Sequence, residues 1–118
     1  MPYTVAFDAA RKRVTITVVP PISEHDAHAG LREARSRPEF RADYAIVIDL
    51  LAADQPPSAT GAVQLGEILK ASVPGHKVAI LWPHPPTTTL AFVQITASPT
   101  VELRLFKGLG EAEAWLSV

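Results

Sequence analysis

The sequence predicts a single α/β domain, spanning residues 1–118, with a mixed five-stranded sheet and four helices. Two segments near the amino terminus alternate apolar with small or polar residues, and only a short turn separates them, which predicts an antiparallel hairpin. Further strand-like segments then alternate with helix-like segments, and this alternation predicts parallel strands joined by crossover helices. The length is that of one ordinary domain.

The hairpin consists of strands predicted at 3–7 and 14–18, where apolar residues alternate mainly with threonine and alanine. This alternation is the period of a half-buried strand. The connection at 8–13 is too short to join parallel neighbours. It contains the basic run Arg11-Lys12-Arg13, which we interpret as a solvated turn rather than as a phosphate-binding site.

The first helix is predicted to begin with Ser23 as its N-cap and to end before Pro38. Its apolar face repeats at i, i+4 and i+7 through Ala27, Leu31 and Ala34. The other side chains of this helix are expected to point elsewhere, among them Arg32, Glu33, Arg35 and Arg37.

The strand predicted within 44–51 is almost continuously apolar, which is typical of a strand covered on both faces. Its only charge, Asp49, lies near the carboxyl end. The remaining predicted elements are a helix capped by Ser58 or Thr60 and ending near Ser72, a strand at 78–82, a helix at 87–97, a strand at 101–105, and a short helix after Gly108-Leu109-Gly110 in which Ala112, Trp115 and Leu116 dock.

Composition excludes several classes of function. The chain has no cysteine, which excludes disulfides, thiolate catalysis and zinc sites built on sulfur. The formal net charge is −1 and no basic stripe is present, so no nucleic-acid partner is expected. We find no secretory signal and no apolar run approaching the roughly 20 residues of a membrane span. We therefore expect a cytoplasmic protein without a membrane span, and no cofactor.

Four segments carry a family resemblance: the hairpin around Phe7-Asp8, Ala45 to Leu50, Lys77 to Ile80, and the ending from Leu105 to Leu116. Together with the order of elements, they resemble the STAS-like fold, named for sulfate transporters and anti-sigma-factor antagonists. The resemblance is to the sporulation-antagonist branch of small stand-alone bacterial proteins in particular. It implies a regulatory role exercised through protein–protein interaction, without catalysis.

In this family a phosphorylatable serine stands in an Asp-Ser-x-Gly turn at the start of the second helix. The matching stretch is Ser58-Ala59-Thr60-Gly61, where Gly61 fits, the acidic position falls on Ser58 and the phosphoserine position falls on Ala59. Ser58 and Thr60 are candidate phosphoacceptors, since a helix N-terminus favours a phosphate, and helix capping is the structural alternative. The layout is also similar to CRAL-TRIO lipid-transfer domains, which implies a carrier.

Two clusters contain residue types used in enzymes. His25 and His28 stand at i, i+3 beside Glu24, a spacing found in metal sites, although helix capping and exposed imidazoles account for the same residues. Asp49 stands at the carboxyl end of one predicted strand and His84 follows the next strand, at the edge where α/β ligand sites lie. Such a pair can act as acid and base. A hydrolase or metal-dependent enzyme is the weakest of our three hypotheses.

The predicted helix at 87–97 is apolar on two sides, whereas a surface helix normally has one apolar stripe. Its two sides are Ala91, Phe92, Ile95 and Leu90, Val93, Ala97. We expect one side to be covered by a second protomer or by an apolar ligand, with Trp82 near the rim. The alternatives are full burial within one monomer, or a strand. The predicted interface or ligand surface comprises Trp82, Leu90, Phe92 and Val93.

The leading hypothesis is thus a non-enzymatic regulatory or protein-interaction module that forms a homodimer through its third helix. The second hypothesis is a carrier of a nonpolar small molecule or lipid, which would use the same surface. The sequence names no partner, ligand or pathway.

Overall fold

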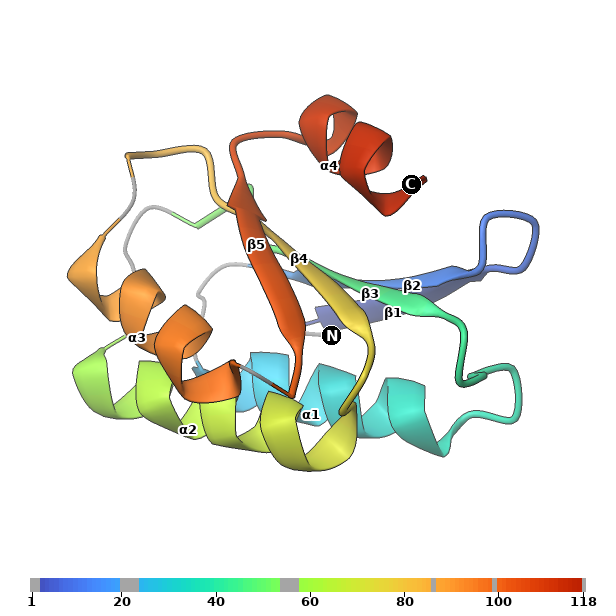
Figure 1. Ribbon diagram of the computed structural model, residues 1–118, viewed down its shortest axis with the longest axis horizontal. Coiled ribbons are helices and arrows are strands. Elements are labelled where there is room, and N and C mark those ends of the chain that lie inside the picture. Colours follow the sequence, from blue (N-terminus) through green and yellow to red (C-terminus); the bar gives the residue numbers. More distant parts are fainter. Residues whose placement is uncertain (1–2, 20–23, 54–57, 86, 99, 118) are drawn as a thin grey trace.

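The computed structural model describes residues 3–19, 24–53, 58–85, 87–98 and 100–117 (Figure 1). The elements in chain order are β1 (Tyr3–Asp8), β2 (Arg13–Val18), α1 (Glu24–Ser36), β3 (Ala45–Asp49), α2 (Ala59–Ser72), β4 (Lys77–Leu81), α3 (Thr88–Ala97), β5 (Glu102–Phe106) and α4 (Leu109–Leu116). This order and the mixed five-stranded sheet confirm the predicted fold class. Ser23, the predicted cap of the first helix, lies outside the described residues.

The five strands lie side by side in sequence order. β1 pairs antiparallel with β2, so that Phe7 stands opposite Val14, and all later neighbours pair parallel. In the turn of the hairpin, the Asp8 carboxylate accepts a hydrogen bond from the backbone N–H of Arg11 at 3.1 Å. Lys12 then takes a positive φ of 55°. The hairpin predicted from the alternating pattern is confirmed.

The described helices are divided unequally between the two faces of the sheet. Figure 1 shows α1, α2 and α3 together on one face and α4 alone on the other. The strand order never reverses, so successive crossovers do not go to opposite faces. In doubly wound sheets such a reversal opens the crevice in which ligands bind. The described sheet therefore has no point at which the strand order reverses.

The main core lies between the sheet and the three crossover helices. The predicted apolar face of α1 is buried here, with Ala27, Leu31 and Ala34 at most 4% exposed. The largest fully buried side chains of this core include Ile16, Leu31, Ile46, Ile48, Leu69, Ile80 and Leu90. Burial at this scale supplies the main favourable term for folding.

A smaller core lies beneath α4, where Ala112 packs with Val47, Ala79 and Leu81. Val47 alternates along β3 with Ile46 and Ile48, which face the main core. Because β3 contributes to both cores, its sequence is almost continuously apolar. The prediction of a strand buried on both faces is confirmed. Phe106, Trp115 and Leu116 pack around the smaller core as partly buried side chains.

Arg13 corrects our interpretation of the basic run 11–13 as a solvated turn. Arg11 and Lys12 are exposed, but Arg13 is the first residue of β2 and is only 6% exposed. Position 13 alternates with Val14, so its side chain lies on the α4 side of the sheet. There the Arg13 Nη1 atom is 2.6 Å from the Glu113 Oε1 atom of α4. The pair attaches α4 to the start of β2.

Candidate functional site

Helix α3 presents one apolar side to the core and a second to the surface. The inner side consists of Leu90, Val93 and Ala97, each at most 1% exposed. On the outer side Ala91 is exposed, Phe92 is 37% exposed and Ile95 is 71% exposed. We term Ala91, Phe92 and Ile95 the outer α3 face. No residue of the helix is charged, so an apolar surface without charge lies open on this monomer.

Of the four residues predicted for the apolar surface, Phe92 alone is exposed. Leu90 and Val93 belong to the core, and Trp82 is 3% exposed. Trp82 Nε1 donates a hydrogen bond to the Pro85 carbonyl oxygen at 3.2 Å, and the His84 ring packs edge-on at 5.0 Å. The burial of these three residues removes them from the surface. The sequence pattern shows two apolar sides of the helix but not which of them meets the sheet.

The neighbouring helix α2 also carries an exposed apolar side chain. α2 approaches α3 at Gly66, where a Cβ atom would lie 2.6 Å from Thr96 Cβ and 3.0 Å from the Val93 carbonyl oxygen. Only glycine permits so close an approach. Val63 stands almost one helical turn before Gly66 and is 43% exposed. The α2–α3 pair thus carries exposed apolar side chains on both helices.

Asp49 and His84 each have a separate structural partner. The Asp49 Oδ1 atom accepts a hydrogen bond from the backbone N–H of Leu51 at 2.9 Å, in the turn after β3. His84 Nε2 lies 3.1 Å from the carbonyl oxygen of Ala53. Among the described residues, no hydrogen bond or ion pair joins the two side chains. An acid and a base must reach one reacting group, and here both residues instead hold backbone segments at the carboxyl edge.

Ser58 and Thr60 are both exposed at the start of α2. Ser58 is the N-cap, because its Oγ atom accepts a hydrogen bond from the backbone N–H of Gly61 at 3.0 Å. The predicted capping role is confirmed for Ser58. The first turn of α2 contains no acidic residue, so a phosphate there would meet the positive end of the helix dipole without a like charge in that turn. Phosphorylation of either hydroxyl stays a prediction.

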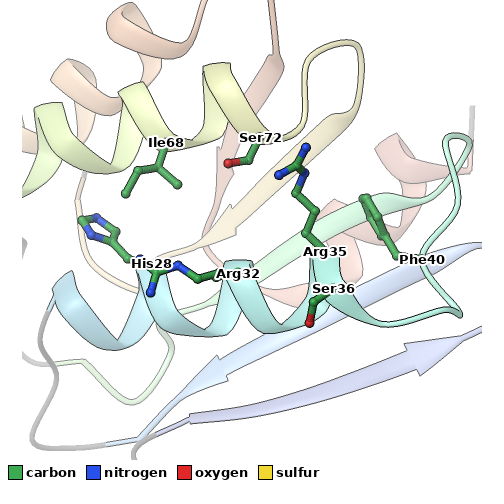
Figure 2. Close-up of a pocket in the computed structure, with 7 residues that line it drawn as sticks. All are labelled: His28, Arg32, Arg35, Ser36, Phe40, Ile68 and Ser72. Carbon is green, nitrogen blue, oxygen red and sulfur yellow. The ribbon is translucent and has the colours of Figure 1, made fainter.

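A groove of about 660 Å³ lies between α1 and α2 (Figure 2). We term it the α1–α2 groove. Its lining residues are His28, Arg32, Arg35 and Ser36 of α1, Phe40 of the following loop, and Ile68 and Ser72 of α2. Figure 2 shows the Arg35 guanidinium reaching toward α2. The sequence patterns did not predict this groove. A signal was present, because His28, Arg32 and Arg35 stand at i, i+4 and i+7 and therefore form one stripe along α1.

The two histidines proposed as metal ligands lie in different environments. His25 is exposed, and His28 is half-buried in the wall of the α1–α2 groove. Within the described part of the chain, no group of three or more histidine, aspartate or glutamate side chains is placed to hold a metal ion. The charged residues that line the groove with His28 are arginines, which repel cations. The metal hypothesis therefore gains no support from this geometry.

On α1, a further charged cluster links the helix to the sheet. The Tyr3 hydroxyl of β1 donates to Glu33 Oε1 at 3.0 Å, and Arg37 donates to Glu33 Oε2 at 2.8 Å. These hydrogen bonds, from Arg37 first and then Tyr3, lower the pKa of Glu33 below its ordinary value. The hydrogen bond with Glu33 also raises the pKa of Tyr3. None of the three residues lines the α1–α2 groove, so we assign them a structural role.

Comparisons of the chain with protein-family models, curated proteins and solved structures found no match. The resemblance to STAS-like domains therefore remains a prediction from the sequence. Among the described helices, none combines the length and the hydropathy needed to cross a bilayer.

Proposed function

We propose that this chain is a small non-enzymatic regulatory module of the STAS-like type, which acts in the cytoplasm by protein–protein contact and associates with a second copy of itself through the outer α3 face. The observation that carries the proposal is the exposure of Phe92 and Ile95 on a helix with no charged residue. Burial of such side chains against a partner is favourable in proportion to the apolar area removed from water.

The spacing of the exposed residues favours packing against another helix. Single exposed apolar residues are ordinary on protein surfaces. Here Ile95 stands four residues after Ala91 and three after Phe92, so the three side chains form one continuous stripe. Ala91 is small and allows a second helix to approach closely. Val63 on the neighbouring helix α2 is a further exposed apolar side chain.

The absence of charge on α3 favours a second copy as the partner. In a two-fold symmetric dimer the same surface patch meets itself. A helix with charges of a single sign would then place like charges near each other, whereas α3 has no charge that would repel a second copy. A strongly acidic or basic partner would gain no complementary charge from this face. Because one short helix provides a small contact area, we expect a weak, reversible dimer.

The test is sedimentation velocity across a concentration series, with native mass spectrometry on the same samples. The wild-type chain is expected to shift from monomer to dimer in the micromolar range, and Ile95→Glu to remain monomeric because it would bury opposing carboxylates. Leu109→Glu is the matched control, since it adds the same charge at an exposed apolar residue of α4. It should dimerise like the wild type.

Three outcomes would overturn self-association through this face: a wild-type chain that is monomeric at all concentrations, an Ile95→Glu variant that dimerises normally, or equal loss of the dimer in both variants. A monomer that carries a non-covalent adduct of lipid-like mass, lost on denaturation, would replace the proposal with the carrier hypothesis.

A further inference from the structure

The α1–α2 groove contains positive charge that the protein itself does not neutralise. Arg32 and Arg35 are exposed and line the groove, and no acidic residue is among the lining residues that the structure describes. Among the described residues, neither guanidinium has an ion pair. Other basic side chains do have one: Arg11, Lys12, Arg13, Arg37 and Lys70. Arg32 and Arg35 differ from the other unpaired basic residues in that both line this groove, so both are available to an anion that enters it.

Helix position explains only one of these charges. Arg35 lies in the last turn of α1, where the negative end of the helix dipole favours a cation. Arg32 lies almost a turn earlier, outside the range of that effect. Like charges at i, i+3 on a helix repel each other. An anion placed between Arg32 and Arg35 would relieve this repulsion and form charge-assisted hydrogen bonds to both.

The opposite wall of the groove supplies an apolar surface and a hydroxyl. Ile68 and Ser72 stand at i, i+4 on α2, and both line the groove. Phe40, which also lines it, is held in place by the His76 ring stacked at 5.0 Å. Ile68 and Phe40 are partly buried and pack on the main core, so they form a supported surface. A ligand in the groove would meet guanidinium groups from α1 and carbon atoms from Ile68 and Phe40.

We propose that the α1–α2 groove binds a small organic phosphate monoester. Its phosphate group is held by Arg35, which reaches toward α2, and by Arg32 once that side chain, which points toward His28 in Figure 2, turns toward Arg35. Its carbon skeleton lies on Ile68 of the opposite wall. A phosphate monoester carries about −1.5 to −2 charges at pH 7, which matches two guanidiniums better than a single carboxylate does. The planar guanidinium also fits phosphate oxygens in a two-point geometry. The volume of about 660 Å³ suits a small molecule.

The test is a titration of the ¹⁵N-labelled full chain followed by nuclear magnetic resonance, with phenyl phosphate as the probe. Inorganic phosphate and phenol are the matched probes, because each carries only half of the proposed ligand. Phenyl phosphate is expected to shift the backbone amides around Arg32, Arg35, Ile68 and Ser72 in a saturable way. Its Kd should be at least about tenfold lower than that of either matched probe, since both walls contribute to binding.

Two substitutions test the assignment of the guanidiniums. Arg32→Gln and Arg35→Gln each remove one charge from the groove. Each is expected to raise the Kd of phenyl phosphate about tenfold. Arg41→Gln is the control, because Arg41 is exposed next to Phe40 in sequence but does not line the groove. It should change the Kd by less than about twofold. All three side chains are exposed, and none has an ion pair among the described residues, so folding should be retained.

The proposal is overturned if no saturable shift appears at the groove, or if inorganic phosphate binds as tightly as phenyl phosphate, which would indicate an adventitious ion only. It is equally overturned if phenol binds as tightly as phenyl phosphate, or if Arg41→Gln weakens binding as much as the groove variants do. The groove does not include the outer α3 face, so Ile95→Glu should bind phenyl phosphate normally. Failure of one proposal is therefore distinguishable from failure of the other.

Discussion

The buried cation Arg13 shows how one residue attaches a helix to the sheet. Removing a guanidinium from water costs several kcal/mol unless a charged partner compensates. Glu113 provides that partner at 2.6 Å from Arg13 Nη1, and Arg11 Nη1 lies 3.6 Å from the same carboxylate oxygen. The Glu113 side chain is 30% exposed, so the pair lies at the edge of the smaller core rather than in its centre.

Substituting Glu113 with glutamine should lower the free energy of unfolding by about 2 kcal/mol, because the buried guanidinium loses its charged partner. The partial exposure of Glu113 keeps this value below that of a fully buried pair. Urea denaturation measures the change. Glu111→Gln is the control, an exposed residue of the same helix that loses the same charge, and it should cost only about 0.5 kcal/mol through the helix dipole. Equal losses in both variants would contradict a specific role for the Arg13–Glu113 pair.

Local sequence rules predicted single residues only where the partner is close in the chain. Ser58 was predicted as a cap because its hydrogen-bond partner, the N–H of Gly61, is three residues away. Arg13 was assigned to solvent because a charged residue in a basic run is normally exposed. Its partner Glu113 lies near the opposite end of the sequence, and no local pattern joins the two.

At the scale of elements, the distances between helices decide which surfaces exist. Gly66 brings α2 close to α3 and leaves Phe92 and Ile95 on the outside of the pair. Between α1 and α2, in contrast, an open groove remains. Periodicity predicted the helices and the buried side of α1. The close approach at Gly66 depends instead on the absence of a Cβ atom, which periodicity does not show. For that reason the close α2–α3 contact could not be predicted, and the α1–α2 groove had only the stripe of His28, Arg32 and Arg35 as a signal.

The close approach at Gly66 gives an expectation for Gly66→Ala. The new Cβ would lie 2.6 Å from Thr96 Cβ, and forcing the two helices apart should cost about 2–3 kcal/mol. The better helix propensity of alanine offsets about 1 kcal/mol of this. We therefore expect a net loss of about 1–2 kcal/mol in urea denaturation.

Gly110→Ala in α4 is the matched control for this substitution, because the alanine Cβ would meet no other part of the fold within 4 Å. Only the better helix propensity of alanine acts at this position, so the free energy of unfolding should stay constant or rise by up to about 1 kcal/mol. A gain in stability for Gly66→Ala would contradict this expectation, because it would show that the new Cβ atom does not force α2 and α3 apart.

At the scale of the whole molecule, the two faces of the sheet are protected very differently. The order of elements was predictable because each parallel strand-to-strand connection contains one recognisable helix. The candidate functional surfaces were harder to predict, since they depend on which parts of these helices remain uncovered. Three crossover helices bury one face, whereas α4 alone covers part of the other (Figure 1). In α4 only Ala112 is fully buried among the described residues.

This asymmetry predicts that α4 opens locally while the rest of the fold stays intact. Native-state hydrogen exchange should give α4 amides an opening free energy about 2 kcal/mol below that of the β3 and β4 amides, which have helices on both sides. Trp115 is one of the contacts of α4 with the rest of the fold, with its ring 5.5 Å from Phe106 and 5.1 Å from Lys77 Nζ. Trp115→Ala should therefore widen the gap between α4 and β3 amides. Leu109→Ala, at an exposed position of the same helix, should leave the gap unchanged. If α4 and β3 amides exchange with one common free energy in the wild-type chain, the second face is not an independent opening unit, and the whole domain unfolds as one.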